Sequence, residues 1–326
     1  MPDVIDSTGY VPLAAVERNG FDEGLHFGRL IALDPDGGVV FAYGDVDAPI
    51  HPRSANKLVQ AAGMRSLGLR LDGRLLALSA ASHWGEPQHV DGVREILDGV
   101  GFDEAALQTT PGFPEDPDAR RAVMCSDNTK RAILHGCSGK HAAMLATCVG
   151  CGWDAGTYLS PERPLQMALR DSLQQVSGAE VSHTAVDGCG APAWAIPLRA
   201  LAASYSAAVR ADPETPIRQV ADAMRTHPEM VCGEASEVTG LMRAVPGLLV
   251  KDGAESVYVA ALPDGCAVAL KISDGGFRAG QAVLVDALER LGANDLPGAD
   301  VAALEQWGQL AVLGHGEPVG RTRSLL

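Results

Sequence analysis

Two hairpin patterns, one near each end of the chain, constrain the fold more than any other feature. Residues 28–44, GRLIALDPDGGVVFAYG, are two apolar runs joined by the turn Asp34–Gly37. Residues 256–272, SVYVAALPDGCAVALKI, repeat the pattern with a turn at Pro263–Gly265. Turn-forming residues between apolar runs are typical of antiparallel hairpins. The chain is therefore expected to build an antiparallel sheet from both of its ends.

Helical patterns fill most of the chain between the hairpins. Residues 161–176 and 216–227 carry apolar side chains at helical spacing, and a further helix is expected from about Ser54 to Leu67. Residues 276–292 predict an amphipathic helix that ends at Gly292. We therefore expect an α+β protein in which the sheet packs on helices and a helical lobe is inserted between the sheet's two parts.

The chain has 326 residues, of which 46% are hydrophobic, enough for one large core. No repeat or linker divides it, so we predict a single domain over residues 1–326. Its sheet-containing lobe is expected at about 1–80 and 245–326, with a mainly helical middle at about 85–245. Residues 317–326 are expected to trail over the surface.

Charge and cysteine content indicate which partners are excluded and which cellular compartment is expected. The formal net charge is −15 and no basic run appears, so neither nucleic acid nor a membrane is an expected partner. Residues 1–20 do not read as a signal peptide, and no stretch approaches the ~18 apolar residues of a membrane span. The seven cysteines are then expected to be free thiols in a reducing cytoplasm. Cys148 and Cys151, the one Cys-x-x-Cys pair, are typical of buried thiols at a helix end.

The stretch HPRSANK, residues 51–57, places Ser54 and Lys57 three positions apart. On a helix such residues share one face. A serine hydroxyl needs a base to become a nucleophile, and a lysine can serve if burial or nearby cations lower its pKa. The first turn of a helix also directs N–H groups at a developing oxyanion. The structural alternative is a capping serine followed by a surface lysine.

Two further stretches carry polar side chains beside apolar runs. LSAASHWGEPQHV, residues 78–90, includes Ser82, His83 and Glu86, and its structural alternative makes Ser82 the cap of a helix over about 89–97. Lys271 closes the apolar strand of ALKISDGG. Its structural alternative is a charge at a strand end that reaches solvent.

Cysteine occurs with lysine, histidine and aspartate in two more stretches. Cys137, Lys140 and His141 fall within one turn of the helix predicted in LHGCSGKHAAML. Asp187 and Cys189, in AVDGCGAPAWAIPL, would point to the same side of an extended segment. Thiolates are ligands for zinc, although the spacing alone is not that of paired zinc knuckles.

Taken together, the segments PRSANKLVQA, ASHWGE, CSGKHAAML, VDGCGAP and ALKISDG resemble the second asparaginase family, the rhizobial type of L-asparaginase. They occur in the family's order and span residues 52–275. The resemblance implies a fold like that of serine β-lactamases and penicillin-binding proteins. It also implies hydrolysis of L-asparagine to L-aspartate and ammonia by a homodimer.

The resemblance also assigns roles to individual residues. Ser54 is the implied nucleophile and Lys57 its base, with Ser82 and Lys271 as a second serine–lysine pair. Because two amines near one nucleophile repel each other's protons, at least one is expected to be neutral at neutral pH. The remaining implied roles are a zinc site that aids substrate binding without taking part in the chemical step (Cys137, Lys140, Cys189) and contacts to the substrate (Asp187, and in support Arg53 and His141).

Departures from the family pattern bear on substrate preference. His135 and Gly136 occupy positions where asparagines are common, and Cys232 and Glu234 lie in a stretch that is glycine-rich in the family. Three alternatives stay open at this point. They are a β-lactamase or peptidase using the same Ser-x-x-Lys pair, though no Ser-Asp-Asn or Lys-Thr-Gly motif is present; a non-catalytic amino-acid- or metal-binding relative; and a zinc hydrolase that uses metal-bound water.

Overall fold

The structure is a computed structural model that describes residues 9–326. Its contacts divide the chain into two compact units. Of the described residues, unit 1 holds 9–55 together with 195–209 and 240–326, and unit 2 holds 56–194 and 210–239. Unit 1 therefore ends its first segment at Ala55 instead of near residue 80. The reason is that helices α1 (Lys57–Ser66) and α2 (Gly73–Ser79) pack on α8 (Pro216–Thr226) in unit 2.

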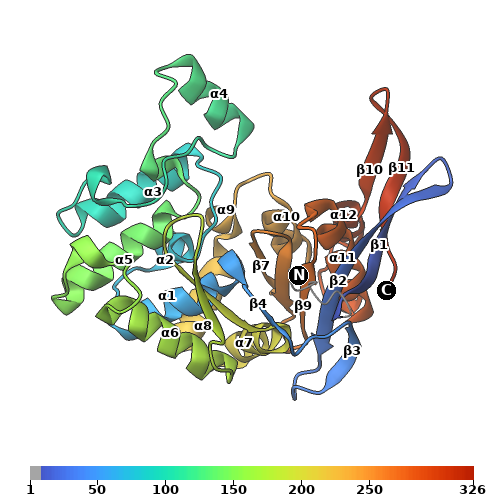
Figure 1. Ribbon diagram of the computed structural model, residues 1–326, viewed down its shortest axis with the longest axis horizontal. Helices are drawn as coiled ribbons and strands as arrows, with labels where there is room; N and C mark the ends of the chain where they lie inside the picture. The colour runs from blue at the N-terminus through green and yellow to red at the C-terminus, as the bar shows by residue number, and fades with distance from the viewer. Residues whose placement is uncertain (1–8) are drawn as a thin grey trace, which may run out of the picture. The chain divides into compact units, whose positions relative to one another are not determined.

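An antiparallel sheet from both ends of the chain forms the centre of unit 1. Its strand order is β10-β11-β1-β2-β9-β8-β7, and β3 also pairs with β2. Figure 1 shows the blue strands β1 and β2 beside the red strands β10 and β11. The predicted α+β class is confirmed. The strands of this sheet are β1 (Val11–Arg18), β2 (Phe21–Leu33), β3 (Val39–Tyr43), β7 (Leu249–Gly253), β8 (Val257–Ala261), β9 (Ala267–Ile272), β10 (Leu310–Gly314) and β11 (Glu317–Ser324).

Both predicted hairpins are present, as β2–β3 and β8–β9. The expectation that residues 317–326 trail over the surface is wrong, because Glu317–Ser324 form β11 between β10 and β1. Its register sets Thr322 opposite Val16 and Ser324 opposite Ala14. This strand is polar and mostly unburied, so it is held by backbone hydrogen bonds to its two neighbours. It has no alternating apolar pattern from which a strand could be predicted.

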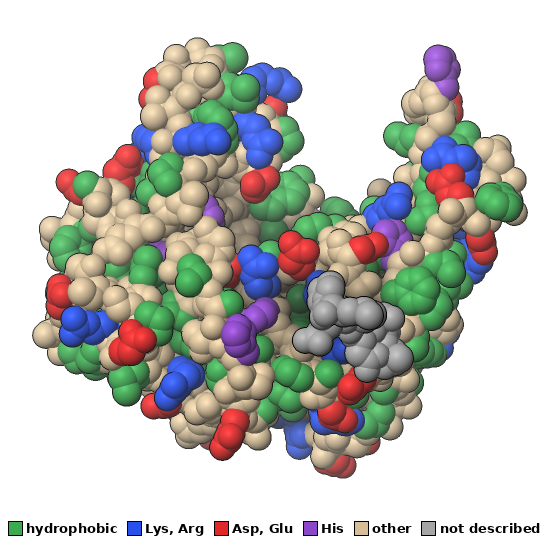
Figure 2. All heavy atoms as spheres, viewed as in Figure 1, with side chains coloured by type: hydrophobic (Ala, Val, Ile, Leu, Met, Phe, Trp, Pro, Cys, Tyr) green, Lys and Arg blue, Asp and Glu red, His purple; other side chains and the backbone are tan. Residues whose placement is uncertain are grey.

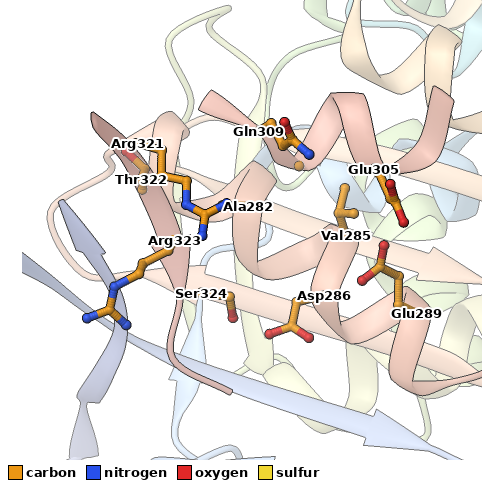
Figure 3. A pocket seen from close by; sticks show the side chains of 11 residues that line it. Ala282, Val285, Asp286, Glu289, Glu305, Gln309, Arg321, Thr322, Arg323 and Ser324 are labelled. Carbon is orange, nitrogen blue, oxygen red and sulfur yellow. The ribbon is translucent and has the colours of Figure 1, made fainter. Parts of the chain in front are cut away.

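Helices α11 (Phe277–Arg290) and α12 (Val301–Gly308) pack together in unit 1, and α11 also contacts β1, β8, β9 and β11. A depression of about 460 Å³ lies between α11, α12 and β11 (Figure 3). In Figure 3 the carboxylates of Glu289 and Glu305 lie near each other, and burial raises the pKa of Glu289. None of the predicted site residues lines this depression. On the face seen in Figure 2, acidic and basic side chains are interspersed.

Unit 2 is mainly helical, and α1 packs against α5, α6 and α8. Several of its helices begin with proline, whose missing N–H costs nothing at the first helical position. The helices predicted over 161–176 and 216–227 are confirmed as α6 and α8. None of the helices in residues 9–326 has the length and apolar content that a bilayer crossing requires. The remaining elements of the chain are β4 (Pro49–Ile50), α3 (Pro87–Asp98), α4 (Pro117–Cys125), α5 (Ser138–Cys151), α6 (Pro164–Ser177), β5 (His183–Val186), β6 (Pro192–Pro197), α7 (Leu198–Arg210), α9 (Pro228–Val231) and α10 (Glu237–Ala244).

Candidate active site

The predicted site residues fall into two groups, one in each unit. Unit 1 holds Arg53, Ser54 and Lys271. The members in unit 2 are Lys57, Ser82, Cys137, Lys140, His141, Asp187 and Cys189.

Ser54 is half-buried in a short 3-10 helix, Arg53–Asn56, that runs directly into α1. Two contacts fix the backbone of this segment within unit 1. A side chain at Gly253 of β7 would come within 2.4 Å of the Pro52 carbonyl oxygen, so only glycine lets the strand approach. The hydroxyl of Tyr205 donates a hydrogen bond of 2.9 Å to the carbonyl of Ala55. The serine is therefore held on a rigid support.

Arg53, the residue before Ser54, adopts a left-handed backbone conformation with φ of +55°. Residues with a Cβ rarely occupy this region, and such strain persists where the surrounding structure enforces it. It is commonly found at functional sites. The strained position therefore favours the hypothesis, made from the motif, that the segment around Ser54 is functional.

Lys271 lies half-buried on β9, where its amine donates hydrogen bonds to the carbonyl oxygens of Glu255 and Ile272, the latter at 2.7 Å. Burial lowers the pKa of Lys271, and the charge of Arg53 lowers it further, against Glu255 and Asp274. The alternative of a strand-end charge that simply reaches solvent does not fit these contacts.

Lys57 is 1% exposed, so the alternative of a surface lysine is wrong. Its amine contacts the Ala81 carbonyl oxygen, the Ser82 hydroxyl oxygen at 3.1 Å and the Cys137 sulfur at 3.1 Å. A lysine ammonium has three protons and no acceptor, whereas a neutral amine has two protons and a lone pair. In its neutral form Lys57 can therefore accept a proton from a neighbouring hydroxyl while it still donates to Ala81.

Ser82 is positioned by a backbone ladder between two loops of unit 2. The N–H of Ser82 donates to the carbonyl of Val231 at 2.8 Å, and the N–H of Trp84 donates to the carbonyl of Cys232 at 2.6 Å. Cys232, one of the residues that depart from the family pattern, therefore contributes its backbone carbonyl to this loop contact. The ladder fixes the Ser82 hydroxyl beside the amine of Lys57.

Helix α3 is capped by Glu86, so the alternative in which Ser82 caps this helix is wrong. The Glu86 carboxylate and the His89 side chain form a reciprocal capping box at the helix start. The same carboxylate accepts the N–H of Glu234 at 2.8 Å. Glu234, which also departs from the family pattern, is thus bonded to the segment that carries Ser82.

His83 and Ser138 form a buried pair that the sequence did not assign to the site. The Nδ1 atom of His83 accepts the N–H of Gly85 at 3.1 Å, and the Ser138 hydroxyl donates to the Ile133 carbonyl at 2.8 Å. His83 Nε2–H therefore donates to the Ser138 oxygen, 2.8 Å away, and the imidazole is neutral. Burial lowers the pKa of His83, and the charges of His89 and Lys57 act in the same direction.

Cys137, Cys189 and Lys140, the residues of the predicted zinc site, lie together. Cys137 and Cys189 pack in one buried cluster, and their interaction lowers the pKa of Cys137 and raises that of Cys189. The Lys140 amine lies 3.4 Å from the Cys189 sulfur. Burial acts to lower the pKa of Lys140, but Cys189, Cys137 and Asp187 outweigh it and raise the value. The two thiols thus lie beside two buried amines, Cys137 beside Lys57 and Cys189 beside Lys140.

Asp187 is half-buried at the start of a turn whose first hydrogen bond joins the Gly190 N–H to the Asp187 carbonyl at 2.8 Å. The segment that carries Asp187 and Cys189 is therefore a turn and not an extended strand. The aspartate still lies close enough to Lys140 for its charge to affect that lysine's pKa.

His135 and Gly136, the first two departures from the family pattern, support the backbone at the thiols. The Cys137 N–H donates to His135 Nδ1 at 3.0 Å. A side chain at Gly136 would come within 2.8 Å of the His83 carbonyl oxygen, so a larger residue requires the loop to move. His135 and Gly136 therefore help to fix the position of the loop that leads into Cys137.

His141 is buried and bonded to a tyrosine that the sequence did not single out. Its Nδ1 atom lies 2.8 Å from the Tyr158 hydroxyl, which also accepts the N–H of Gln108 at 2.9 Å. Within residues 9–326, no hydrogen-bond partner reaches His141 Nε2. Burial and the charge of Lys140 lower the pKa of His141. Tyr158 lies 13 residues beyond Leu145, the end of the nearest motif, so only the fold brings it here.

Comparison with known proteins decides the family. The family model described as L-asparaginase II matches residues 14–324. The chain belongs to the L-asparaginase II family. The resemblance seen in the five motifs is confirmed, and as a family member the chain is an amidohydrolase.

Other comparisons add little to this family assignment. No curated protein matches the chain. Among solved structures, a β-lactamase from Mycobacterium bovis is 15% identical with a TM-score of 0.41, over 81% of this chain and 94% of that one. A Bacillus glutaminase is 14% identical with a TM-score of 0.38, over 82% and 91%. At these TM-scores the activity of this asparaginase II chain has to be argued from its own site.

The zinc site implied by the family stays a prediction. In residues 9–326 no three or more His, Cys, Asp or Glu side chains are grouped to hold a metal. The paired thiols of Cys137 and Cys189 do fit the sulfur ligands that zinc prefers. Lys140 fits as a third donor only after losing its proton, which the two sulfurs stabilise in this structure.

The buried histidines predict a pH dependence of stability. The pKa values of His83 and His141 are lowered in the fold, so below about pH 6.5 the unfolded chain binds more protons than the folded one. The free energy of unfolding should then fall by up to about 1.4 kcal/mol per pH unit for each histidine. Urea unfolding of wild type and His83→Gln between about pH 7.5 and 5.5 should show a shallower slope in the variant. The exposed His315→Gln is the control, and equal slopes in all three proteins would contradict the prediction.

Proposed function

We propose that this member of the L-asparaginase II family hydrolyses L-asparagine to L-aspartate and ammonia through an acyl-enzyme on Ser54. The observation that supports this most directly is the buried amine of Lys57. It lies 3.1 Å from the Ser82 hydroxyl and follows Ser54 by three residues. A buried amine in contact with a hydroxyl is the arrangement that an amine base requires.

In the proposed reaction the Ser54 oxygen attacks the side-chain amide carbon of asparagine, and neutral Lys57 accepts the hydroxyl proton. The tetrahedral intermediate collapses when the leaving nitrogen receives a proton, so that ammonia departs and an ester on Ser54 remains. Water then attacks the ester, releases L-aspartate and restores the serine. Each step needs one group that first accepts and then returns a proton.

Ser82 and Lys271 are proposed as the second serine–lysine pair. The contact of Ser82 with Lys57 suits a hydroxyl that passes a proton to or from the first pair. Burial lowers the pKa of Lys271, which favours the neutral form that can accept a proton. Pairing of Lys271 with Ser82 stays a prediction.

Substrate contacts are proposed for residues of both groups. The Asp187 carboxylate would hold the α-ammonium of asparagine, with Arg53 and His141 in support. When zinc is bound, Cys137, Lys140 and Cys189 would hold it, and its charge would order the substrate pocket. The chemical step remains with the serines and lysines.

Ammonia release from L-asparagine, L-glutamine and buffer alone tests the proposed substrate. We expect release from asparagine at a kcat/KM well above that for glutamine. The β-lactamase alternative is measured beside it with nitrocefin, whose colour change reports β-lactam opening. Turnover of nitrocefin without ammonia release from asparagine would reverse the ranking of the two functions.

Metal removal separates the proposed role of zinc from that of a zinc hydrolase. After treatment with a chelator, KM for asparagine should rise while a measurable kcat remains, because the metal orders the pocket and the serine performs the attack. Re-addition of zinc should restore KM. Complete loss of kcat with the chelator, recovered only by zinc, would instead favour metal-bound water as the nucleophile.

A reducing cytoplasm and a homodimer are also proposed. All seven cysteines are free thiols in the structure, which supports a reducing compartment. The homodimer rests on the family resemblance alone. Light scattering coupled to size-exclusion chromatography would decide it.

A further inference from the structure

We propose that Cys137 and Cys189 are also a redox modification site, at which hydrogen peroxide joins the two sulfurs in a reversible disulfide. The disulfide would remove the Cys137 sulfur from its contact with Lys57 and so switch the hydrolase off. This goes beyond the proposed hydrolysis, and only its effect on activity rests on that function.

The first support is the packing of the two cysteines in one buried cluster. Cys137 and Cys189 lie in that cluster although 52 positions separate them in the chain. The side chains are 8% and 2% exposed and pack on Ala191 and Leu159. Disulfide formation needs the sulfurs to close to about 2.05 Å, so packing in one cluster leaves a short distance to travel.

The second support is the position of both cysteines outside the interior of any helix or strand. Cys137 directly precedes α5, and Cys189 lies in a turn flanked by Gly188 and Gly190, the latter at φ of +87°. Closing the disulfide therefore does not require a helix or strand to be broken. By contrast, Cys148 and Cys151 both lie within the single helix α5.

The proposed chemistry is balanced with peroxide as the oxidant. The Cys137 sulfur attacks one oxygen of hydrogen peroxide, the O–O bond breaks, and a sulfenic acid and one water form. The Cys189 sulfur then attacks the oxidised sulfur, an S–S bond forms, and the second water leaves. Two thiols and one peroxide thus give one disulfide and two waters, and a dithiol reductant reverses the change.

The link to activity is the 3.1 Å contact between the Cys137 sulfur and the Lys57 amine. A disulfide sulfur carries no charge and no proton, so it is a weaker hydrogen-bond partner for the Lys57 amine than a thiol or thiolate, and the position of the amine changes. A bound metal would occupy both sulfurs and should protect them from the oxidant. Oxidation and metal binding therefore compete for one pair of atoms.

Peroxide treatment of the metal-free full chain, followed by thiol titration and intact mass, tests the proposal. The protein should lose two titratable thiols and about 2 Da, the mass of two hydrogens, and regain both with dithiothreitol. Peptide mapping should find residues 137 and 189 in one cross-linked fragment. Added zinc should slow the reaction, and ammonia release should fall and recover in parallel with the thiols.

Variants separate this pair from the other cysteines. Cys151→Ser removes the pair on α5, and Cys125→Ser removes an exposed thiol, so both should still form the disulfide. Cys189→Ser should not lose two hydrogens. The proposal is overturned if residues 137 and 189 still titrate after oxidation, if the cross-link joins other cysteines, or if Cys137 accumulates as sulfinic acid. Mass and thiol counts do not depend on activity, so failure here is distinct from failure of the proposed hydrolysis.

Discussion

Replacement of Ser54 by alanine is expected to lower kcat/KM for ammonia release from L-asparagine by at least about 10⁴-fold, the scale seen when a hydrolase loses its nucleophile. Removing one oxygen leaves the rest of the segment in place, because backbone contacts to Gly253 and Tyr205 hold it. Stability should therefore stay within about 0.5 kcal/mol of wild type. Ammonia release gives the first value and urea unfolding the second.

Ser66→Ala is the matched control. Its hydroxyl lies on the last turn of the helix that follows Ser54 and bonds to its own helix at the Ala62 carbonyl, so the change should leave ammonia release unaffected. Unchanged release in Ser54→Ala would remove this serine from the role of nucleophile and make Ser82→Ala the next variant to measure. A wild-type protein that binds asparagine without releasing ammonia would favour the non-catalytic alternative.

Lys57→Ala is expected to have the second-largest effect, a loss of about 10³-fold or more in kcat, because the proposed base is removed. The truncation also removes the hydrogen bonds that the amine donates to the Ala81 carbonyl and to the Ser82 hydroxyl. Each such loss costs about 1–3 kcal/mol, so the free energy of unfolding should fall clearly. The variant therefore has to be assayed where urea unfolding shows it to be folded.

Chemical rescue separates the two effects of this variant. Methylamine can enter the space vacated by the lysine side chain, and it should raise the rate of ammonia release in Lys57→Ala in proportion to its concentration. The exposed Lys130→Ala is the control and should match wild type with and without methylamine. A Lys57→Ala protein that is folded and as active as wild type would show that this amine is not the base.

The fold was predictable where the chain carries a local pattern. The turn residues at 34–37 and 263–265 predicted both hairpins, and apolar spacing predicted the helices at 164–177 and 216–226. Strand β11 was missed because its stability lies in hydrogen bonds to β10 and β1, which no local pattern reports. The boundary at Ala55 was missed for the same reason, since contacts of α1 with α8 set it.

The motifs predicted which residues belong to the candidate site but not all of the contacts between them. The motifs named Cys137, Cys189 and Lys140, which the structure brings together, but gave no sign that Lys57 contacts Cys137. That contact joins residues 80 positions apart and depends on how α1 packs. Tyr158 was missed because one tyrosine outside every motif carries no signal until the fold sets it on His141.

The pairing of β11 on both of its edges has a consequence for biosynthesis. The first strand, β1, has β2 as a local neighbour, but its other edge pairs with residues 320–324, which are synthesised about 300 residues later. Long-range pairings of this kind are slow to form because the intervening chain must be ordered first. A nascent chain would thus expose an open edge of β1 until these residues have left the ribosome.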